Sequence, residues 1–139
     1  MLVIAVDPGE KRLGIAISDP TGTIANPLEV LEHVSRTIEA ASIAQLAIER
    51  GAELIVIGQA LDEENRPTPQ ARRAARLAGA IRAQTSTPVL LWDESGSTQT
   101  ARQARVALGA PRSKRRGHLD ELAATVILQT YLDAQATQD

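Results

Sequence analysis

Short apolar runs and longer helical patterns alternate along this chain. Residues 2–6 (Leu-Val-Ile-Ala-Val) form an apolar run that meets Asp7 and the turn pair Pro8-Gly9. This pattern predicts a buried strand with a polar residue at its carboxyl end. Residues 13–18 predict a second strand, 19–22 a hairpin turn and 23–25 a short third strand. The fold is therefore expected to open with consecutive hairpins.

The middle of the chain alternates helices and strands. Ser35 suits the N-cap of a helix that ends at Arg50, with Gly51 as its stop. Residues 53–58 predict a buried strand, residues 62–68 a polar loop, and the Ala- and Arg-rich segment up to residue 85 a helix. Residues 88–92 predict a last strand, which again ends in acids.

The final third is expected to be helical with one interruption. Residues 97–108 predict a helix capped by Ser97 or Thr98, and 110–117 a basic loop. The last helix then carries an apolar face made of Leu119, Leu122, Ala123, Val126, Ile127 and Tyr131. The order of elements predicts an α/β fold: a mixed five-stranded sheet with antiparallel first hairpins, parallel later strands and flanking helices.

Composition narrows the class of protein. A chain of 139 residues suits one domain, residues 1–139, and 43% hydrophobic with 23% charged residues is a globular composition. The absence of Cys excludes disulfides and thiolate metal sites, so a metal must bind oxygen ligands or the two His. Without a signal-peptide pattern or a run approaching ~18 apolar residues, we expect a cytoplasmic protein that does not enter a membrane.

Charge and aromatic content bear on nucleic-acid binding. A net charge of -2 is not that of a strongly basic domain, and 1% aromatic residues leave no base-stacking platform. Any nucleic acid would therefore be contacted through its backbone and shape. Arg72, Arg73 and Arg76 indicate a solvent-exposed helix face, with a track for the substrate as the alternative, and we assign no role to His33. The basic loop before the last helix predicts phosphate contacts from Arg112, Lys114, Arg115 and Arg116.

Acids stand at special places in this predicted fold. Asp7 ends the first strand, Asp93 and Glu94 end the last one, and Asp120 lies in the first turn of the final helix. Carboxyl ends of parallel strands share one edge of a sheet, where ligand sites gather. Clustered carboxylates repel one another unless a cation lies between them, and Mg²⁺ or Mn²⁺ would suit oxygen ligands. Such metals activate water and stabilise the charge on a phosphate being cleaved.

A long motif adds a family resemblance. Residues 7–19, Asp-Pro-Gly-Glu-Lys-Arg-Leu-Gly-Ile-Ala-Ile-Ser-Asp, resemble the D-x-G-x-K-R-x-G-x-A-x-S-D signature of the YqgF (RuvX) family. The resemblance continues through residues 54–58, 92–94 and 119–128 in the same order. That family is described as Holliday-junction-resolvase-like and as nucleases for precursors of small-subunit ribosomal RNA, with an RNase H-like fold.

The resemblance implies roles for particular residues. Asp7, Asp93, Glu94 and Asp120 would be catalytic, with Asp7, Glu94 and Asp120 binding the metal. Lys11 and Arg12 would contact the phosphate backbone, and Gly9 would allow a tight turn. The implied activity is that of a metal-dependent endonuclease on structured nucleic acid, which processes ribosomal RNA precursor or resolves Holliday junctions.

Two other functions stay open. The family motif has Arg after the acid pair, where this chain has Ser95, so the alternative is a catalytically weak or inactive nucleic-acid-binding module. A sugar-kinase or actin-type ATPase also begins with an Asp and Gly after its first strand, but it needs two such domains. The sequence leaves open RNA or DNA as substrate, one metal or two, Asp93 or Glu94 as ligand, and a monomer or a homodimer.

Overall fold

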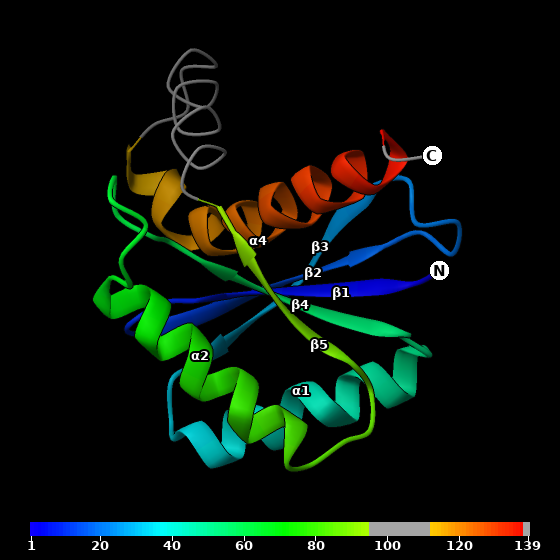
Figure 1. The fold of residues 1–139 in the computed structure, drawn as a ribbon, viewed down its shortest axis with the longest axis horizontal. Helices are drawn as coiled ribbons and strands as arrows, with labels where there is room; N and C mark the ends of the chain where they lie inside the picture. The colour runs from blue at the N-terminus through cyan, green and yellow to red at the C-terminus, as the bar shows by residue number, and fades with distance from the viewer. Residues whose placement is uncertain (95–111, 138–139) are drawn as a thin grey trace.

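The protein has three layers, with a twisted sheet between one long helix and a pair of helices (Figure 1). The computed structural model describes residues 1–94 and 112–137, and it describes side chains outside residues 112–121. The sheet order is β3-β2-β1-β4-β5. Helix α4 crosses one face, and α1 and α2 cover the other (Figure 1).

The sheet is mixed, as predicted. Strands β1 (Val3–Pro8), β2 (Arg12–Ser18) and β3 (Ala25–Glu32) pair antiparallel in sequence order. Strand β4 (Leu54–Gln59) pairs parallel with β1, and β5 (Val89–Asp93) pairs parallel with β4. Two parallel crossovers therefore place β1 at the centre of the sheet, with the hairpins on one side of it.

The helices begin and end for local reasons. Helix α1 (Arg36–Arg50) starts where the Ser35 hydroxyl accepts the N–H of Ile38 at 3.2 Å, and it ends at Gly51 with φ 71°. Both caps confirm the sequence prediction. Helix α2 (Pro69–Arg82) starts where the Thr68 hydroxyl accepts the N–H of Ala71 at 3.1 Å. Helix α4 covers Arg112–Ala136.

The predicted third strand, residues 23–25, was wrong in its extent. Strand β3 runs from Ala25 to Glu32 at the edge of the sheet, and half of its residues are exposed. Pro27 interrupts its sequence pattern where the register with β2 shifts. Proline is tolerated at an edge or a bulge because its missing N–H is not needed there. Pairing with β2 creates this strand more than its own pattern does.

The predicted basic loop at 110–117 was also wrong. Helix α4 already begins at Arg112, so the backbone of Arg112, Lys114, Arg115 and Arg116 is helical. Arg and Lys are good helix formers, and packing of the rest of the helix outweighs the cost of Gly117. The helix predicted over 97–108 lies outside the described residues.

The two faces of the sheet carry different cores. Under α1 and α2, large side chains dominate, among them Ile4, Ile15, Ile43, Ile57 and Ile81. Under α4, the sheet contributes the smaller Val3, Ala5, Ala16 and Val56, which meet Ala124, Ile127, Leu128 and Tyr131. Small residues let the long helix approach the sheet closely. In the part of the chain that is described, no helix is long and apolar enough to cross a membrane.

Candidate active site

Asp7 lies near the carboxyl end of β1, and its side chain faces helix α4. Its side chain follows Val3 and Ala5, which are buried under α4, in the alternation of the strand. Asp7 is half-buried and stands opposite Gly14 of β2. The next residue, Pro8, lies on the other face. Asp7 is thus the second-last residue of the strand, one position before the strand end at which the sequence analysis placed it.

Glu94 lies on the same face as Asp7. Its N–H donates to the Gln59 carbonyl oxygen at 2.8 Å, so it continues the pairing of β5 with β4 by one residue. The residue is only 6% exposed. Its Oε2 would be 3.2 Å from a Cβ added at Gly58, and Ile127 of α4 meets the same point. The Glu94 carboxylate is therefore packed between the end of β4 and helix α4.

Asp93 faces the opposite side of the sheet. Val89 and Leu91 of β5 pack into the core under α1 and α2, whereas Trp92 packs into the core under α4. The alternation therefore carries Asp93 to the side of α1 and α2, where it is exposed. Of the two adjacent acids, Glu94 shares a face with Asp7 and Asp93 does not.

Gly58 separates the two acids. It pairs with Trp92 of β5 and follows Ile57, whose partner in β1 is Val6. Two strand spacings, roughly 10 Å, separate β1 from β5. An added Cβ at Gly58 would lie 2.5 Å from Ile127 Cδ1, closer than such atoms approach. The missing side chain lets Ile127 of α4 and the Glu94 carboxylate approach the sheet on the face that Asp7 and Glu94 share.

Gln70 holds this end of the sheet together, and the sequence prediction missed it. From the first turn of α2, its Nε2 donates to the Gly58 carbonyl oxygen at 3.0 Å and to Glu94 Oε1 at 3.4 Å. Its Oε1 accepts the N–H of Ala60 at 2.6 Å. A glutamine in a helix gives no sequence signal for this role, because its partners lie on two strands.

Asp120 is placed differently from the prediction. It lies about two turns inside α4 rather than in its first turn. Because the helix dipole acts mainly within the first turn, it stabilises the charged form of Asp120 little. The helical repeat puts position 120 two turns before Ile127, on the same side of the helix. Its side chain is outside the described ones. Among described residues, no three His, Cys, Asp or Glu form a metal-binding group.

The predicted phosphate contacts lie at the same edge of the sheet. Lys11 is exposed in the turn after β1, and the Arg12 Nε lies 3.5 Å from Glu32 Oε1 in an exposed ion pair. The Gly9 N–H donates to the Arg12 carbonyl oxygen at 3.0 Å, and a Cβ on Gly9 would collide with that oxygen, which confirms the tight turn. The backbone of the first residues of α4 lies near this edge as well (Figure 1).

Tight contacts hold α4 on the site's face. The Trp92 Nε1 donates to the Thr130 hydroxyl at 3.1 Å, and its ring meets Tyr131 edge-on with centroids 5.3 Å apart. Toward the opposite edge of the sheet, where β3 lies, Gln129 accepts the N–H of Ala25 at 2.9 Å and donates to the Thr23 carbonyl oxygen at 3.0 Å. Trp92 is thus an anchor for the helix.

Sequence comparisons give a consistent result. The chain matches, over residues 1–134, the family model described as "RuvX: Holliday junction resolvase". A protein of Syntrophus aciditrophicus (strain SB) named "Putative pre-16S rRNA nuclease" is 37% identical over 134 residues, 96% of this chain and 89% of that protein. One of the same name from Geobacillus kaustophilus (strain HTA426) is 36% identical over 137 residues, 97% of this chain and 99% of that protein.

Solved structures confirm the fold. T. thermophilus RuvC in complex with a Holliday junction substrate matches with a TM-score of 0.59 at 21% identity, over 98% of this chain and 96% of that one. The fowlpox virus Holliday junction resolvase matches with a TM-score of 0.57 at 14% identity, over 97% and 99%. At such identities the likeness concerns the fold alone, and it confirms the RNase H-like class expected from the sequence.

Proposed function

This chain belongs to the RuvX family of Holliday junction resolvases, and from that premise we propose that it is a nuclease that cleaves phosphodiesters in structured nucleic acid. Precursor of small-subunit ribosomal RNA is the first substrate to test, because the similar proteins are named for it. A four-way DNA junction is the second, because the family model is named for it. The same proposal places the protein in the cytoplasm, together with the ribosomal RNA precursor.

The observation that carries this proposal is the pair of acids across Gly58. Asp7 and the buried Glu94 share one face at the carboxyl edge of three parallel strands, and Gly58 of the strand between them lets the Glu94 carboxylate lie close to the sheet. Ligand sites of open α/β sheets gather at such an edge. Two acids from strands that are not neighbours thus face the same side at the same edge of the sheet, which a purely structural role for either acid does not require.

The donor set suits Mg²⁺ or Mn²⁺. Carboxylate oxygens are the ligands that these hard cations prefer. Asp7 and Glu94, joined by Asp120 of α4, are the residues that would hold the metal. When bound, such a metal activates water and stabilises charge on the phosphate.

The remaining residues act on the carboxylates and on the substrate. Gln70 holds the Glu94 carboxylate and the end of β4 in fixed relation. Lys11 and Arg12, beside Asp7, would contact the nucleic-acid backbone, as would the basic start of α4. Charge-assisted contacts of this kind orient a strand without selecting its sequence.

The test is a cleavage assay on labelled ribosomal RNA precursor and on a four-way DNA junction. Wild type and Asp7→Asn are each incubated with Mg²⁺, Mn²⁺ or EDTA. We expect metal-dependent cutting by the wild type and a loss of at least about a hundredfold in Asp7→Asn. Undiminished cutting by Asp7→Asn would remove the carboxylate site from the mechanism.

A binding module is the second candidate function. The observation that favours it is Ser95, which follows the acid pair where the family motif has Arg. If that change has abolished turnover, the protein binds the same substrates with an affinity that falls steeply with salt, yet cuts none of them in any metal. Cutting by the wild type in the assay above excludes this candidate.

A further inference from the structure

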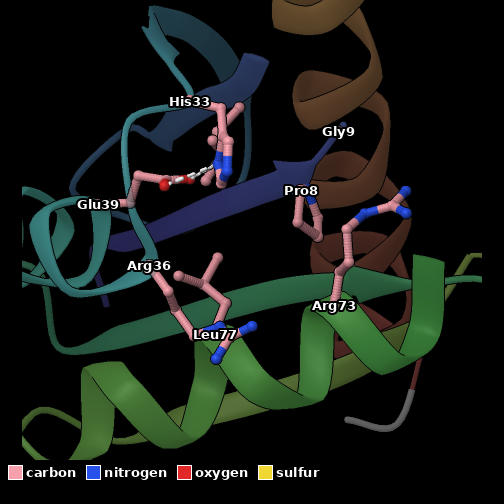
Figure 2. Close-up of a pocket in the computed structure, with 8 residues that line it drawn as sticks. Pro8, Gly9, His33, Arg36, Glu39, Arg73 and Leu77 are labelled. Carbon is pink, nitrogen blue, oxygen red and sulfur yellow. Dashed lines mark hydrogen bonds and ion pairs between the residues drawn. The ribbon is translucent and has the colours of Figure 1, made fainter. Parts of the chain in front are cut away.

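A pocket of about 300 Å³ lies on the opposite face from the two acids, at the same edge of the sheet (Figure 2). Pro8 and Gly9 line it from the end of β1, His33 from the link after β3, and Arg36 and Arg73 from α1 and α2. A volume of this size is that of a small-ligand site. Asp7 and Glu94 face the other way, and Asp93, although on this side of the sheet, does not line the pocket.

The pocket lining is basic. Arg36 is the first residue of α1, Arg73 lies in the second turn of α2, and Figure 2 shows the Arg73 side chain extending beside Pro8. Within the described part of the chain, the buried Arg73 Nε has no hydrogen-bond acceptor. An unsatisfied buried donor costs free energy that a bound acceptor would recover. Arg73 also forms an ion pair with the exposed Glu10, at 3.9 Å between Nη1 and Oε1. This contact is too long and too solvated to take the place of a hydrogen-bond acceptor for the buried Nε.

The single acid in the lining is covered by His33. Glu39 is 5% exposed, and the His33 Nδ1 lies 2.9 Å from both of its carboxylate oxygens (Figure 2). One N–H cannot satisfy two acceptors fully, and Oε2 counts among the described side-chain atoms without a hydrogen-bond partner. Glu39 thus holds the imidazole at the pocket wall, and the imidazole lies over its charge.

We propose that this pocket binds a phosphate group of the nucleic acid, with Arg73 and Arg36 as its ligands and His33 at its wall. Arginine suits phosphate because its planar fork donates two parallel hydrogen bonds. Asp7 and Pro8 are consecutive, so a strand that crosses the end of β1 with one phosphate on the acids can place a nearby phosphate in the pocket. The identity of the ligand as nucleic acid rests on the proposed function; the phosphate chemistry does not.

The first test uses inorganic phosphate and no substrate. Thermal unfolding is followed with increasing phosphate against chloride at equal ionic strength. Ligand that binds only the folded state raises the melting temperature. We expect the rise in wild type and in Arg50→Gln, which removes the same charge from the far end of α1. We expect it to vanish in Arg73→Gln and to shrink in Arg36→Gln.

The second test separates a chain-end phosphate from an internal diester. A short RNA with a 5′-monophosphate and the same RNA with a 5′-hydroxyl are titrated in EDTA, where cutting is prevented. Arg73→Gln is expected to weaken binding about tenfold relative to Arg50→Gln. A loss confined to the 5′-monophosphate RNA assigns the pocket to a chain end, and an equal loss for both RNAs assigns it to an internal diester.

Two results together would overturn the proposed pocket. Phosphate would not raise the melting temperature of the wild type, and Arg73→Gln would bind both RNAs as tightly as Arg50→Gln does. Circular dichroism of each variant checks its folding. If Arg73→Gln does not fold, Arg73→Lys keeps the charge, loses the fork and serves in its place. Failure of the nuclease proposal looks different: no RNA or junction is cut, while inorganic phosphate still stabilises the protein through Arg73.

Discussion

The two faces of one sheet edge differ in almost every respect. On the α4 face, the strands present valines, alanines and a glycine, α4 packs closely on them, and two acids lie at the edge of this layer. On the face of α1 and α2, isoleucines fill the interior, and a basic pocket remains at its rim. Side-chain size therefore decides where polar groups can lie on each face. On the α4 face they lie between the sheet and the helix, and on the other face they lie outside the packed core.

The two adjacent acids at the end of β5 give the strongest test of this difference between the faces. Glu94→Gln is expected to lower the cleavage rate at least about a hundredfold, because it removes a charged oxygen from the face of Asp7. Asp93→Asn removes the same charge one residue earlier, on the other face, and is expected to stay within about threefold of wild type. Initial rates on ribosomal RNA precursor at saturating Mg²⁺ measure both. Equal losses in the two variants would contradict the assignment of faces.

Gly58 tests how closely α4 is packed on the sheet, and Gly79 of α2 serves as its control. In Gly58→Ala, the new Cβ must displace Ile127, so we expect the free energy of unfolding to fall by about 1–3 kcal/mol. Gly79→Ala lies in α2 with nothing within 4 Å of its new Cβ, and helix propensity predicts a gain of about 0.5–1 kcal/mol. Urea unfolding of both variants gives the two values. A Gly58→Ala protein as stable as wild type would mean that Ile127 can move away from the new Cβ without cost.

Gln70 tests whether Glu94 must be held from the side. Gln70→Ala removes the donor to Glu94 and to the end of β4, and we expect the cleavage rate to fall about tenfold, the effect of losing a partner that orients a metal ligand. Gln45→Ala is the matched control, since Gln45 donates to Glu49 on the exposed side of α1. Michaelis–Menten parameters on the same substrate separate a lost rate from a lost affinity.

Asp19, at the other edge of the sheet, shows an acid with a structural role. Hydrogen bonds from the Ile24 N–H, the Thr21 hydroxyl and the Thr23 N–H hold its pKa well below the usual carboxyl range. A depressed folded-state pKa contributes stability above the unfolded pKa, and that stability is lost as pH falls toward the folded value. Asp19→Ala is expected to lower the melting temperature slightly at neutral pH, with cleavage unchanged.

The pH dependence checks that assignment. The gap in melting temperature between wild type and Asp19→Ala is expected to narrow as pH falls below the ordinary carboxyl range, since the wild type then loses what the variant already lacks. A gap that stays constant down to strongly acidic pH would show that the loop geometry, and not the charge, stabilises this turn.

Much of the fold could be predicted where local chemistry decides it. The Ser35 cap and the Gly51 stop of α1, the buried runs that become β1, β2 and β4, and the tight turn at Gly9 all depend on residues near one another in sequence. The edge strand β3 and the start of α4 escaped prediction, because pairing and packing with distant residues outweigh their own weak patterns.

The candidate site divides in the same way. The long motif at residues 7–19, and acids at the ends of predicted strands, are visible in the sequence and led to the family and to Asp7, Asp93, Glu94 and Asp120. Alternation along β5 also implies that Asp93 and Glu94 face opposite sides. Which of them shares a face with Asp7 depends on the relation between β1 and β5, which β4 separates.

The sequence by itself therefore determined the order of elements, the family and the residues from which a nuclease site can be built. Only the tertiary structure decided that Glu94 joins Asp7, that Gln70 holds Glu94, and that Arg36, Arg73 and His33 surround one pocket. The physical reason is that turns, caps and alternation arise from neighbouring residues, whereas these groups meet only after sheet pairing and helix packing bring distant segments together.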